Sequence, residues 1–106
     1  TNQVDQLDDV VSDTKAHRVT NAGFEVQLAN REYDLLQFFL AHPAEVFTRD
    51  DLLDQVWGAD FLGQQNVVDV YVGYLRSKLE TPNAQPLIKT VRGVGYKLRE
   101  PIANAQ

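Results

Sequence analysis

The chain has 106 residues, 43% of them hydrophobic, with two histidines and neither cysteine nor methionine. This length suits one domain around a single core, and the lack of cysteine excludes disulfides and thiolate metal sites, as suits a reducing cytoplasm. No apolar run approaches the roughly 20 residues that span a bilayer, and the polar, acidic beginning is unlike a signal peptide.

The net charge of −5 combines two halves of opposite sign. Residues 1–60 hold twelve carboxylates against four cations, or −8, whereas residues 61–106 hold three carboxylates against six cations, or +3. Binding to nucleic acid is carried by lysine and arginine placed against phosphates. The asymmetry therefore favours an anionic partner for the second half, although uneven charge also occurs in domains without such a partner.

The first part of the chain predicts a small sheet. Residues 1–6 are polar without periodicity, which indicates a linker or a frayed end. Short apolar and β-branched runs then alternate with turn residues. They predict three antiparallel strands, near residues 7–11, 15–20 and 24–28.

Three helices are predicted to follow. The first covers NREYDLLQFFLA, whose apolar side chains have helical spacing and which is followed by the breaker Pro43. The second covers RDDLLDQVW, with Thr48 as its N-cap and Gly58 closing it. The third covers roughly residues 66–80, and its core stripe is Val68, Val72, Leu75 and Leu79.

The end of the chain predicts a basic hairpin. After a loop bracketed by Pro82 and Pro86, two strands are expected at residues 87–91 and 96–98. They surround the turn RGVG, whose glycines can take positive φ. The residues beyond 99 indicate a short tail. The predicted fold class is therefore α+β, with a small N-terminal sheet, three helices and a C-terminal hairpin.

The face of the third helix opposite its core stripe has no charged residue. It holds Asn66, Val70, Gly73, Tyr74 and Ser77. Compact side chains of this kind fit the floor of a DNA major groove, where Val or Tyr can touch thymine methyl groups and Asn or Ser can bond base edges. A mid-helix glycine costs about 1 kcal/mol relative to alanine, which a close approach of another backbone can offset. The alternative is a helix packed on both sides against protein.

Cations flank that face and continue into the hairpin. Arg76 and Lys78 are placed to meet phosphates beside a groove, and Lys89, Lys97 and Arg99 extend the set. Each of them alone is more simply a solubilising surface residue. At the hairpin tip, Arg92 can enter a narrow minor groove, where the potential is most negative.

Four further residues are candidates for contacts with DNA, and some of them have a structural alternative. Thr90 and Tyr96 carry hydroxyls that can bond phosphate, but the Tyr96 ring can equally pack under the hairpin. Trp57 is expected in the core with its indole N–H free for a phosphate. Asp69 can stabilise the start of the third helix or accept from a cytosine amine.

No residue pattern supports catalysis. Neither Ser12 nor Ser77 has a histidine nearby in a predicted element, and the carboxylates are scattered over helix surfaces. We therefore expect no enzymatic activity, no metal and no cofactor. A small hydrolase remains only as a formal alternative.

The segments VFTRDDLLDQVWG, NVVDVYVGYLRSKLE and IKTVRGVGYKL, in this order and spacing, resemble the effector domain of the OmpR/PhoB family of bacterial response regulators. The resemblance covers about residues 7–99, and the three segments together are highly specific. It implies a winged helix-turn-helix that binds double-stranded DNA, with residues 66–79 as recognition helix in the major groove and residues 87–98 as wing in the minor groove. The expected role is the output half of a two-component transcription factor.

The resemblance also implies roles for single residues. It places phosphate contacts at Trp57, Arg76, Thr90 and Tyr96, groove contacts at Val67, Asp69, Val70 and Tyr74, and minor-groove insertion at Arg92. With the residues named above, the expected DNA-binding set is Trp57, Asn66, Val67, Asp69, Val70, Gly73, Tyr74, Arg76, Ser77, Lys78, Lys89, Thr90, Arg92 and Tyr96. A loop of Gly58, Ala59, Asp60, Phe61, Leu62, Gly63, Gln64 and Gln65 matches the segment that can touch RNA polymerase in such proteins.

Other expectations concern partners. The resemblance implies a homodimer on direct-repeat sites and a phosphorelay acting through an N-terminal receiver domain that these residues do not include. The chain departs from the family pattern at Asn66 and at Gly73-Tyr74, where many members carry arginine, so weak affinity and a shallow salt dependence are expected. Ala29 replaces the usual threonine cap, so the start of the first helix is expected to depend on Asn30 or to fray. The rival interpretation is a winged helix that docks on protein through residues 70–74 or 58–65.

Overall fold

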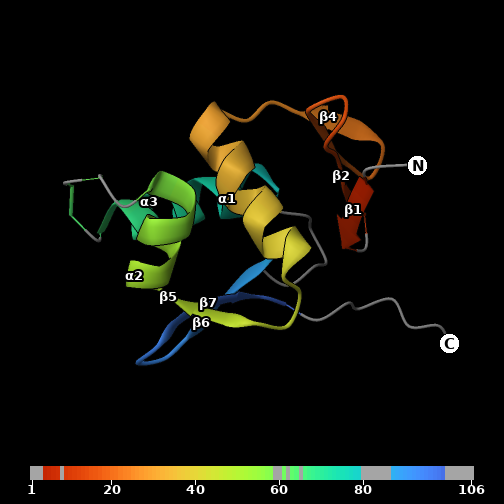
Figure 1. The fold of residues 1–106 in the computed structure, drawn as a ribbon. Helices are drawn as coiled ribbons and strands as arrows, with labels where there is room; N and C mark the ends of the chain where they lie inside the picture. The colour runs from red at the N-terminus through yellow and green to blue at the C-terminus, as the bar shows by residue number, and fades with distance from the viewer. Residues whose placement is uncertain are drawn as a thin grey trace, which may run out of the picture.

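The computed structural model describes residues 4–7, 9–58, 61, 63–64, 66–79 and 87–99. Within these residues, a four-stranded sheet and a three-stranded sheet lie on either side of the helices (Figure 1). This is the α+β arrangement that the sequence predicts. No described helix combines the length and the apolar character that a membrane crossing requires.

The N-terminal sheet has four strands, not the three that the sequence predicts. Its strands are β1 (Val4–Leu7), β2 (Val10–Asp13), β3 (Arg18–Asn21) and β4 (Phe24–Val26), antiparallel and in chain order. The strand expected near residues 7–11 is divided by a turn at Asp9, since consecutive aspartates disfavour strand and favour turns. Residues 4–6, predicted as linker, pair with β2 instead.

The second predicted strand, near residues 15–20, begins later than expected. The Asp13 carboxylate accepts hydrogen bonds from the backbone N–H groups of Lys15 and Ala16, both at 3.1 Å. Such a bond from an aspartate to the backbone two residues on holds a turn. Residues 14–17 therefore form a turn, and β3 starts only at Arg18.

Helix α1 (Asn30–Ala41) begins without the help of Asn30 and without a side-chain cap at Ala29. The Glu32 carboxylate accepts from the Ala29 backbone N–H at 2.9 Å instead. This is half of a capping box, formed from the third helical position back to the N-cap. The start of α1 is therefore held by the Glu32 side chain, and not by Asn30 as the sequence predicts.

The second helix follows its predicted boundaries but changes from an α-helix to a π-helix along its length. The Thr48 hydroxyl accepts from Asp51 N–H at 3.0 Å, and Asp51 accepts from Thr48 N–H at 3.1 Å, which completes a capping box. Helix α2 (Arg49–Leu52) then continues as a π-helix, η1 (Leu53–Trp57), and ends at Gly58 with φ 104°. The Gly58 N–H donates to the carbonyl of Leu53, five residues back, which is the wider π spacing.

The third helix and the hairpin form largely as predicted. Helix α3 covers Asn66–Lys78, and the hairpin strands are β6 (Ile88–Val91) and β7 (Gly95–Leu98). The hairpin gains a third strand, β5 (Val46–Thr48), in the order β5-β7-β6. The sequence did not predict β5, because a run of three residues has no periodicity to detect. The loop bracketed by Pro82 and Pro86 lies outside the described residues.

The two glycines of the predicted hairpin turn, Gly93 and Gly95, are required for different structural reasons. Gly93 adopts φ 75°, as predicted. Gly95 is not among the glycines with positive φ. A Cβ at Gly95 would lie 2.0 Å from the carbonyl oxygen of Phe47, so this glycine lets β7 approach β5 closely.

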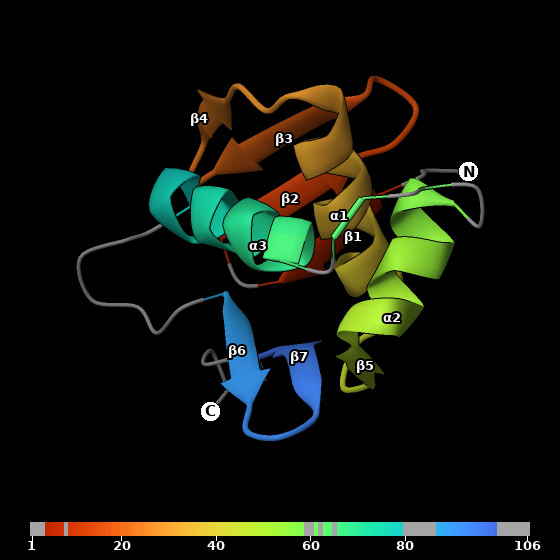
Figure 2. The ribbon, with the colours of Figure 1, turned by 90° about the vertical axis from the view of Figure 1, so that its left-hand side faces the viewer.

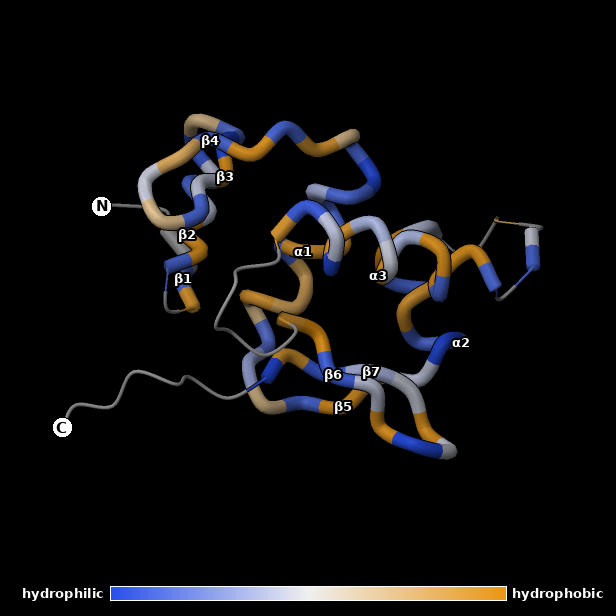
Figure 3. Tube along the Cα trace, turned by 180° about the vertical axis from the view of Figure 1, so that it is seen from behind, coloured by the Kyte–Doolittle hydropathy of each residue, from blue (hydrophilic) through white to orange (hydrophobic). Residues whose placement is uncertain are grey.

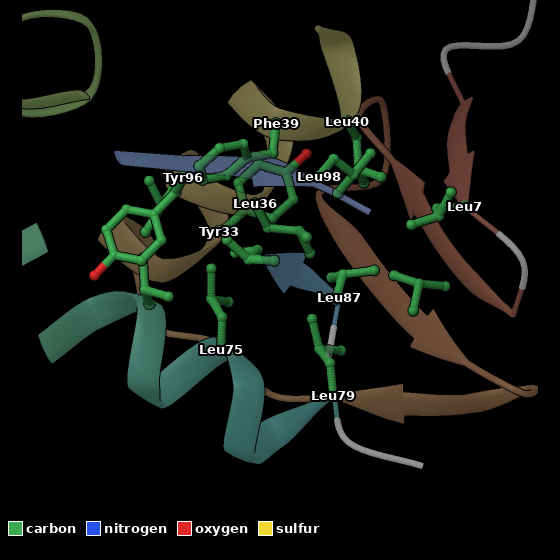
Figure 4. Packing of buried hydrophobic residues seen from close by; sticks show 14 of the residues in the cluster. Leu7, Tyr33, Leu36, Phe39, Leu40, Leu75, Leu79, Leu87, Tyr96 and Leu98 are labelled. Atoms are coloured by element: carbon green, nitrogen blue, oxygen red, sulfur yellow. The ribbon is translucent and has the colours of Figure 1, made fainter. Parts of the chain in front are cut away.

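One core connects the two sheets and the helices. All four stripe residues predicted on α3 are buried, and they pack with α1, the hairpin and the inner side of the N-terminal sheet. Figure 4 shows Leu75 and Leu79 pointing from α3 toward Leu36 and Leu87, with Leu7 approaching from the N-terminal sheet. In Figure 3, orange and blue alternate along the elements, as expected of amphipathic segments around a shared interior. This packing fixes α3 beside the hairpin.

Candidate nucleic-acid interface

The uncharged face of α3 points to solvent. Val70 and Tyr74 are 43% and 47% exposed, and Asn66, Gly73 and Ser77 are exposed beside them. Figure 2 shows α3 running between the N-terminal sheet and the hairpin. Within the chain this face is therefore exposed, and the alternative, packing of both sides against protein, would require another chain.

Nothing in the described domain explains the glycine on that face. A Cβ built at Gly73 would meet no atom within 4 Å beyond the backbone of its own helix and its chain neighbours. Alanine would therefore fit, and it would favour the helix by about 1 kcal/mol. No contact among the described residues therefore requires glycine at this position.

Arg76, predicted to contact phosphate, fastens α3 to the hairpin. Its Nε and Nη2 donate to the backbone carbonyl of Ile88 at 2.9 and 2.7 Å, and Nη2 also donates to the Thr90 hydroxyl at 2.8 Å. Its guanidinium lies 5.7 Å from the ring centroid of Tyr96. The Nε and Nη2 donors of Arg76 are thus bonded inside the domain, and so is the Thr90 hydroxyl.

Asp69 ties α3 to two other elements. Its Oδ1 accepts from Arg49 Nε at 2.9 Å and from the hydroxyl of Tyr96. Burial by itself would raise the pKa of Asp69, but the hydrogen bonds from Tyr96 and Arg49 outweigh it and lower that pKa. Burial, and then the bond to Asp69, raise the pKa of Tyr96. We call Arg49, Asp69, Arg76, Thr90 and Tyr96 the hinge network, because they join α2, α3 and the hairpin.

Of the two roles considered for Tyr96, a phosphate contact and packing under the hairpin, the structure favours packing. Its side chain is buried, with 5% exposed, and Figure 4 shows its ring in the core beside Phe39. The guanidinium of Arg49 lies 5.7 Å from the ring centroid. The ring therefore packs under the hairpin, while the hydroxyl reaches Asp69.

Lys78, also predicted to contact phosphate, has an internal partner. Its ammonium donates at 2.7 Å to Oε1 of Glu32, whose side chain is only 5% exposed. The pair joins the end of α3 to the start of α1, where the same carboxylate atom caps the helix. Removal of Lys78 would leave a buried carboxylate unpaired.

The hairpin presents cations of a different kind. Lys89 lies directly opposite Lys97 in the β6–β7 register, and Arg92 is exposed at the tip. None of the three forms an ion pair with another described residue. Like charges opposite each other destabilise a sheet, so this arrangement is unfavourable unless an anion lies against it. We call Lys89, Arg92 and Lys97 the wing cations.

The geometry thus joins an uncharged, exposed helix face to the wing cations, which form no ion pair with a described residue. Residues 23–98 match the sequence model of the family described as "Transcriptional regulatory protein, C terminal". The chain belongs to this family. Its members are regulators of transcription, not enzymes, and the resemblance to the OmpR/PhoB-type winged-helix domain of response regulators is confirmed.

Individual relatives agree with this membership. The chain is 47% identical over 92 residues to the uncharacterized transcriptional regulatory protein YkoG of Bacillus subtilis, covering 87% of this chain and 40% of that protein. It is 44% identical over 92 residues to the response regulator MprA of Mycobacterium sp. strain KMS, with the same coverage of 87% and 40%. The chain therefore spans about 40% of the length of these curated relatives.

A solved structure supports the fold. The DNA-binding domain of Klebsiella pneumoniae RstA, in complex with the RstA box, superposes with a TM-score of 0.79 at 30% identity. The match covers 91% of this chain and 96% of that one. In this fold α3 corresponds to the helix that the sequence analysis expects to be the recognition helix, and the β6–β7 hairpin corresponds to the expected wing.

The remaining predicted residues lie near the start of the recognition helix. Trp57 is half-buried, with its ring centroid 5.3 Å from that of Tyr71, and the Arg31 guanidinium lies 5.8 Å from its ring. Val67 is half-buried against the core. In the loop predicted to touch RNA polymerase, Gly58, Phe61, Gly63 and Gln64 are described, whereas Ala59, Asp60, Leu62 and Gln65 lie outside the described residues.

Sequence reasoning missed two residues that organise this winged helix. Arg49 was seen only as part of a helix start, and Glu32 only as part of an amphipathic helix. Their partners are 20 and 46 positions away along the chain, at Asp69 and Lys78. No local pattern reports such pairs. The sequence held one indication of these ion pairs. The cations of the second half can pair with carboxylates of the acidic first half as well as with phosphates.

Proposed function

We propose that this chain binds double-stranded DNA in a sequence-specific manner, as the output domain of a two-component response regulator that controls transcription. The observation that carries the proposal is the combination of the uncharged exposed face of α3 with the adjacent wing cations. The helix face offers contacts to bases, and the wing offers contacts to phosphates. The DNA-binding domain of RstA, which is 30% identical to this chain, is solved in complex with the RstA box.

We assign two kinds of role to the residues of this site. Asn66, Val70, Tyr74 and Ser77 face solvent and are proposed to meet base edges in the major groove, and Arg92 to enter the minor groove. Lys89 and Lys97 supply charge toward phosphates. The hinge network residues act as positioning residues, because their polar atoms bond one another.

The partners of the full-length protein follow from the relatives. Because the chain spans 40% of MprA, a response regulator, we infer that a receiver domain belongs N-terminal to it and governs it by phosphorelay. We further infer a homodimer on direct-repeat sites, contact of residues 58–65 with RNA polymerase, and action in the bacterial cytoplasm. The exposed Phe61 ring, 6.3 Å from Trp57, supports a contact role for that loop.

Selection from a random duplex pool tests the proposal. The chain and a variant that lacks the wing cations, Lys89→Ala/Arg92→Ala/Lys97→Ala, are each used to retain fragments at the same low salt concentration. We expect the wild type to enrich a discrete motif and the variant to retain little DNA, since counterion release supplies much of the affinity. A wild type that enriches no sequence would overturn the proposal, and retention by the variant equal to that of the wild type would remove the wing from it. In the first case, docking on protein through residues 70–74 or 58–65 becomes the better account.

A further inference from the structure

The exposed face of the recognition helix has a definite chemical character. It presents an amide at Asn66, aliphatic and aromatic surface at Val70 and Tyr74, and a hydroxyl at Ser77. It has no cation. Guanine in the major groove shows two acceptors, which arginine or lysine reads best, whereas thymine shows a methyl group that apolar side chains contact.

The cations beside this face have internal partners. The Arg76 Nε and Nη2 groups converge on the Ile88 carbonyl, so the bidentate fork that would read guanine is already engaged. The Lys78 ammonium is bonded to the buried Glu32 carboxylate. The carboxylate of Asp69, which could accept from cytosine, is bonded to Arg49 and Tyr96. The charged side chains that could recognise G·C pairs are thus bonded within the domain on both sides of this face.

The geometry points to a recognition helix that selects A·T pairs, with Val70 and Tyr74 packed against thymine 5-methyl groups and Asn66 bonded to adenine. This inference rests on the proposed function and names the class of site that it takes. Asparagine bonds adenine through N6 and N7, and apolar side chains touch the thymine methyl group. The open space at Gly73 lets the helix axis approach the methyl groups closely. The wing favours the same class of site, because A-tracts have a narrow minor groove that attracts arginine such as Arg92.

Replacement of thymine by deoxyuridine tests this reading, because the substitution removes only the 5-methyl group. Each thymine of the selected duplex is replaced in turn, and Kd is measured by fluorescence anisotropy. At contacted positions we expect binding to weaken about fourfold, the equivalent of one buried methyl group at about 0.8 kcal/mol. Val70→Ala should reduce that ratio toward one at the thymine that Val70 touches. Tyr74→Ala should do the same at its own thymine.

Val46→Ala is the matched control. Val46 is 42% exposed, against 43% for Val70, but it lies on β5 of the hairpin sheet and not on α3. This variant should keep the full preference for thymine over deoxyuridine. An effect of deoxyuridine on duplex shape alone would persist in Val70→Ala, so the variants separate contact from shape.

The outcomes distinguish this inference from the proposed function. Selected sites rich in G·C under the recognition helix, or equal affinity for thymine and deoxyuridine at every position, would overturn the inference and leave DNA binding intact. Loss of the deoxyuridine effect in Val46→Ala as well as in Val70→Ala would also overturn it. The absence of any duplex binding at low salt would instead overturn the proposed function itself.

Discussion

The cations of α3 and those of the wing differ in whether they have partners within the described domain. On α3, Arg76 and Lys78 are bonded to other parts of the domain. On the wing, Lys89, Arg92 and Lys97 form no ion pair with a described residue. Charge on the helix therefore holds the fold together, whereas charge on the wing remains available to a partner.

The difference implies two kinds of binding energy. Contacts of uncharged side chains with bases depend on shape and on excluded water, and they respond weakly to salt. Contacts of cations with phosphates release counterions and respond strongly to salt. Specificity should thus reside on the helix and salt-dependent affinity on the wing, and the following experiments can separate the two.

The largest effect should come from salt. The three wing cations together neutralise about three phosphates, with a slope of about −0.9 for each, so affinity should fall about fortyfold between about 50 and about 200 mM salt. A titration by fluorescence anisotropy at several salt concentrations measures the slope. The variant without the wing cations should lose most of it. An unchanged slope in that variant would place the phosphate contacts elsewhere.

Replacement of the tip residue should come next. Arg92→Ala should weaken binding about tenfold, because it removes a cation from the minor groove. The midpoint of denaturant unfolding should change little, since the side chain is exposed. Arg18→Ala is a suitable control. Arg18 is also exposed and pairs only loosely with Glu25, at 3.7 Å on the N-terminal sheet, and its loss should leave Kd unchanged.

Removal of the charge that joins the two regions should have an intermediate effect. Asp69→Asn should lower the free energy of unfolding at neutral pH by about 1–1.5 kcal/mol, because Arg49 and Tyr96 lose a charged acceptor that is partly exposed. DNA affinity should fall with little change in salt slope, since the hinge network joins the helix to the wing. Asp34→Asn, which breaks a surface pair at 3.6 Å, should have almost no effect.

The same carboxylate predicts a dependence on pH. The folded state lowers the pKa of Asp69 below its ordinary value of 3.8. Its stabilising contribution is therefore complete above that ordinary value and is lost as pH falls through the folded pKa. Unfolding measured between neutral and acid pH should show this loss in the wild type. A matching loss in Asp69→Asn would assign it to other carboxylates.

The smallest effect should be a gain in stability. Gly73→Ala should stabilise the domain by about 0.8–1 kcal/mol, because nothing in the fold obstructs the added methyl group. If DNA approaches the helix at this point, the same variant should bind more weakly. Gly95→Ala is the contrasting control and should destabilise, since its Cβ would lie 2.0 Å from a carbonyl oxygen. Unfolding and binding curves for both variants check these signs.

Local patterns predicted most of the fold. The buried stripe of α3 and the Thr48 capping box follow from residues that are close in sequence, and both are confirmed. The strand β5 could not be predicted, because it exists only through its pairing with β7, about 50 positions away. The division of residues 4–13 into two strands was missed because apolar residues stand on both sides of the turn.

The candidate site was predictable in composition but not in pairing. The exposed face of α3 follows from helical periodicity alone. Whether a flanking cation meets a partner inside the fold depends on contacts between distant segments. The bonds of Arg76 to Ile88 and of Lys78 to Glu32 are of this kind.

The pair of opposed lysines on the wing, Lys89 and Lys97, links the binding of an anion to the stability of the fold. Two ammonium groups in one register repel each other in the empty domain, and a polyanion laid across them removes that repulsion. The empty hairpin is then the electrostatically strained state, and the occupied hairpin is the relaxed one. Ligand-free protein should accordingly melt at a higher temperature when multivalent anions are added, and charge neutralisation at either lysine should reproduce part of that rise without any anion.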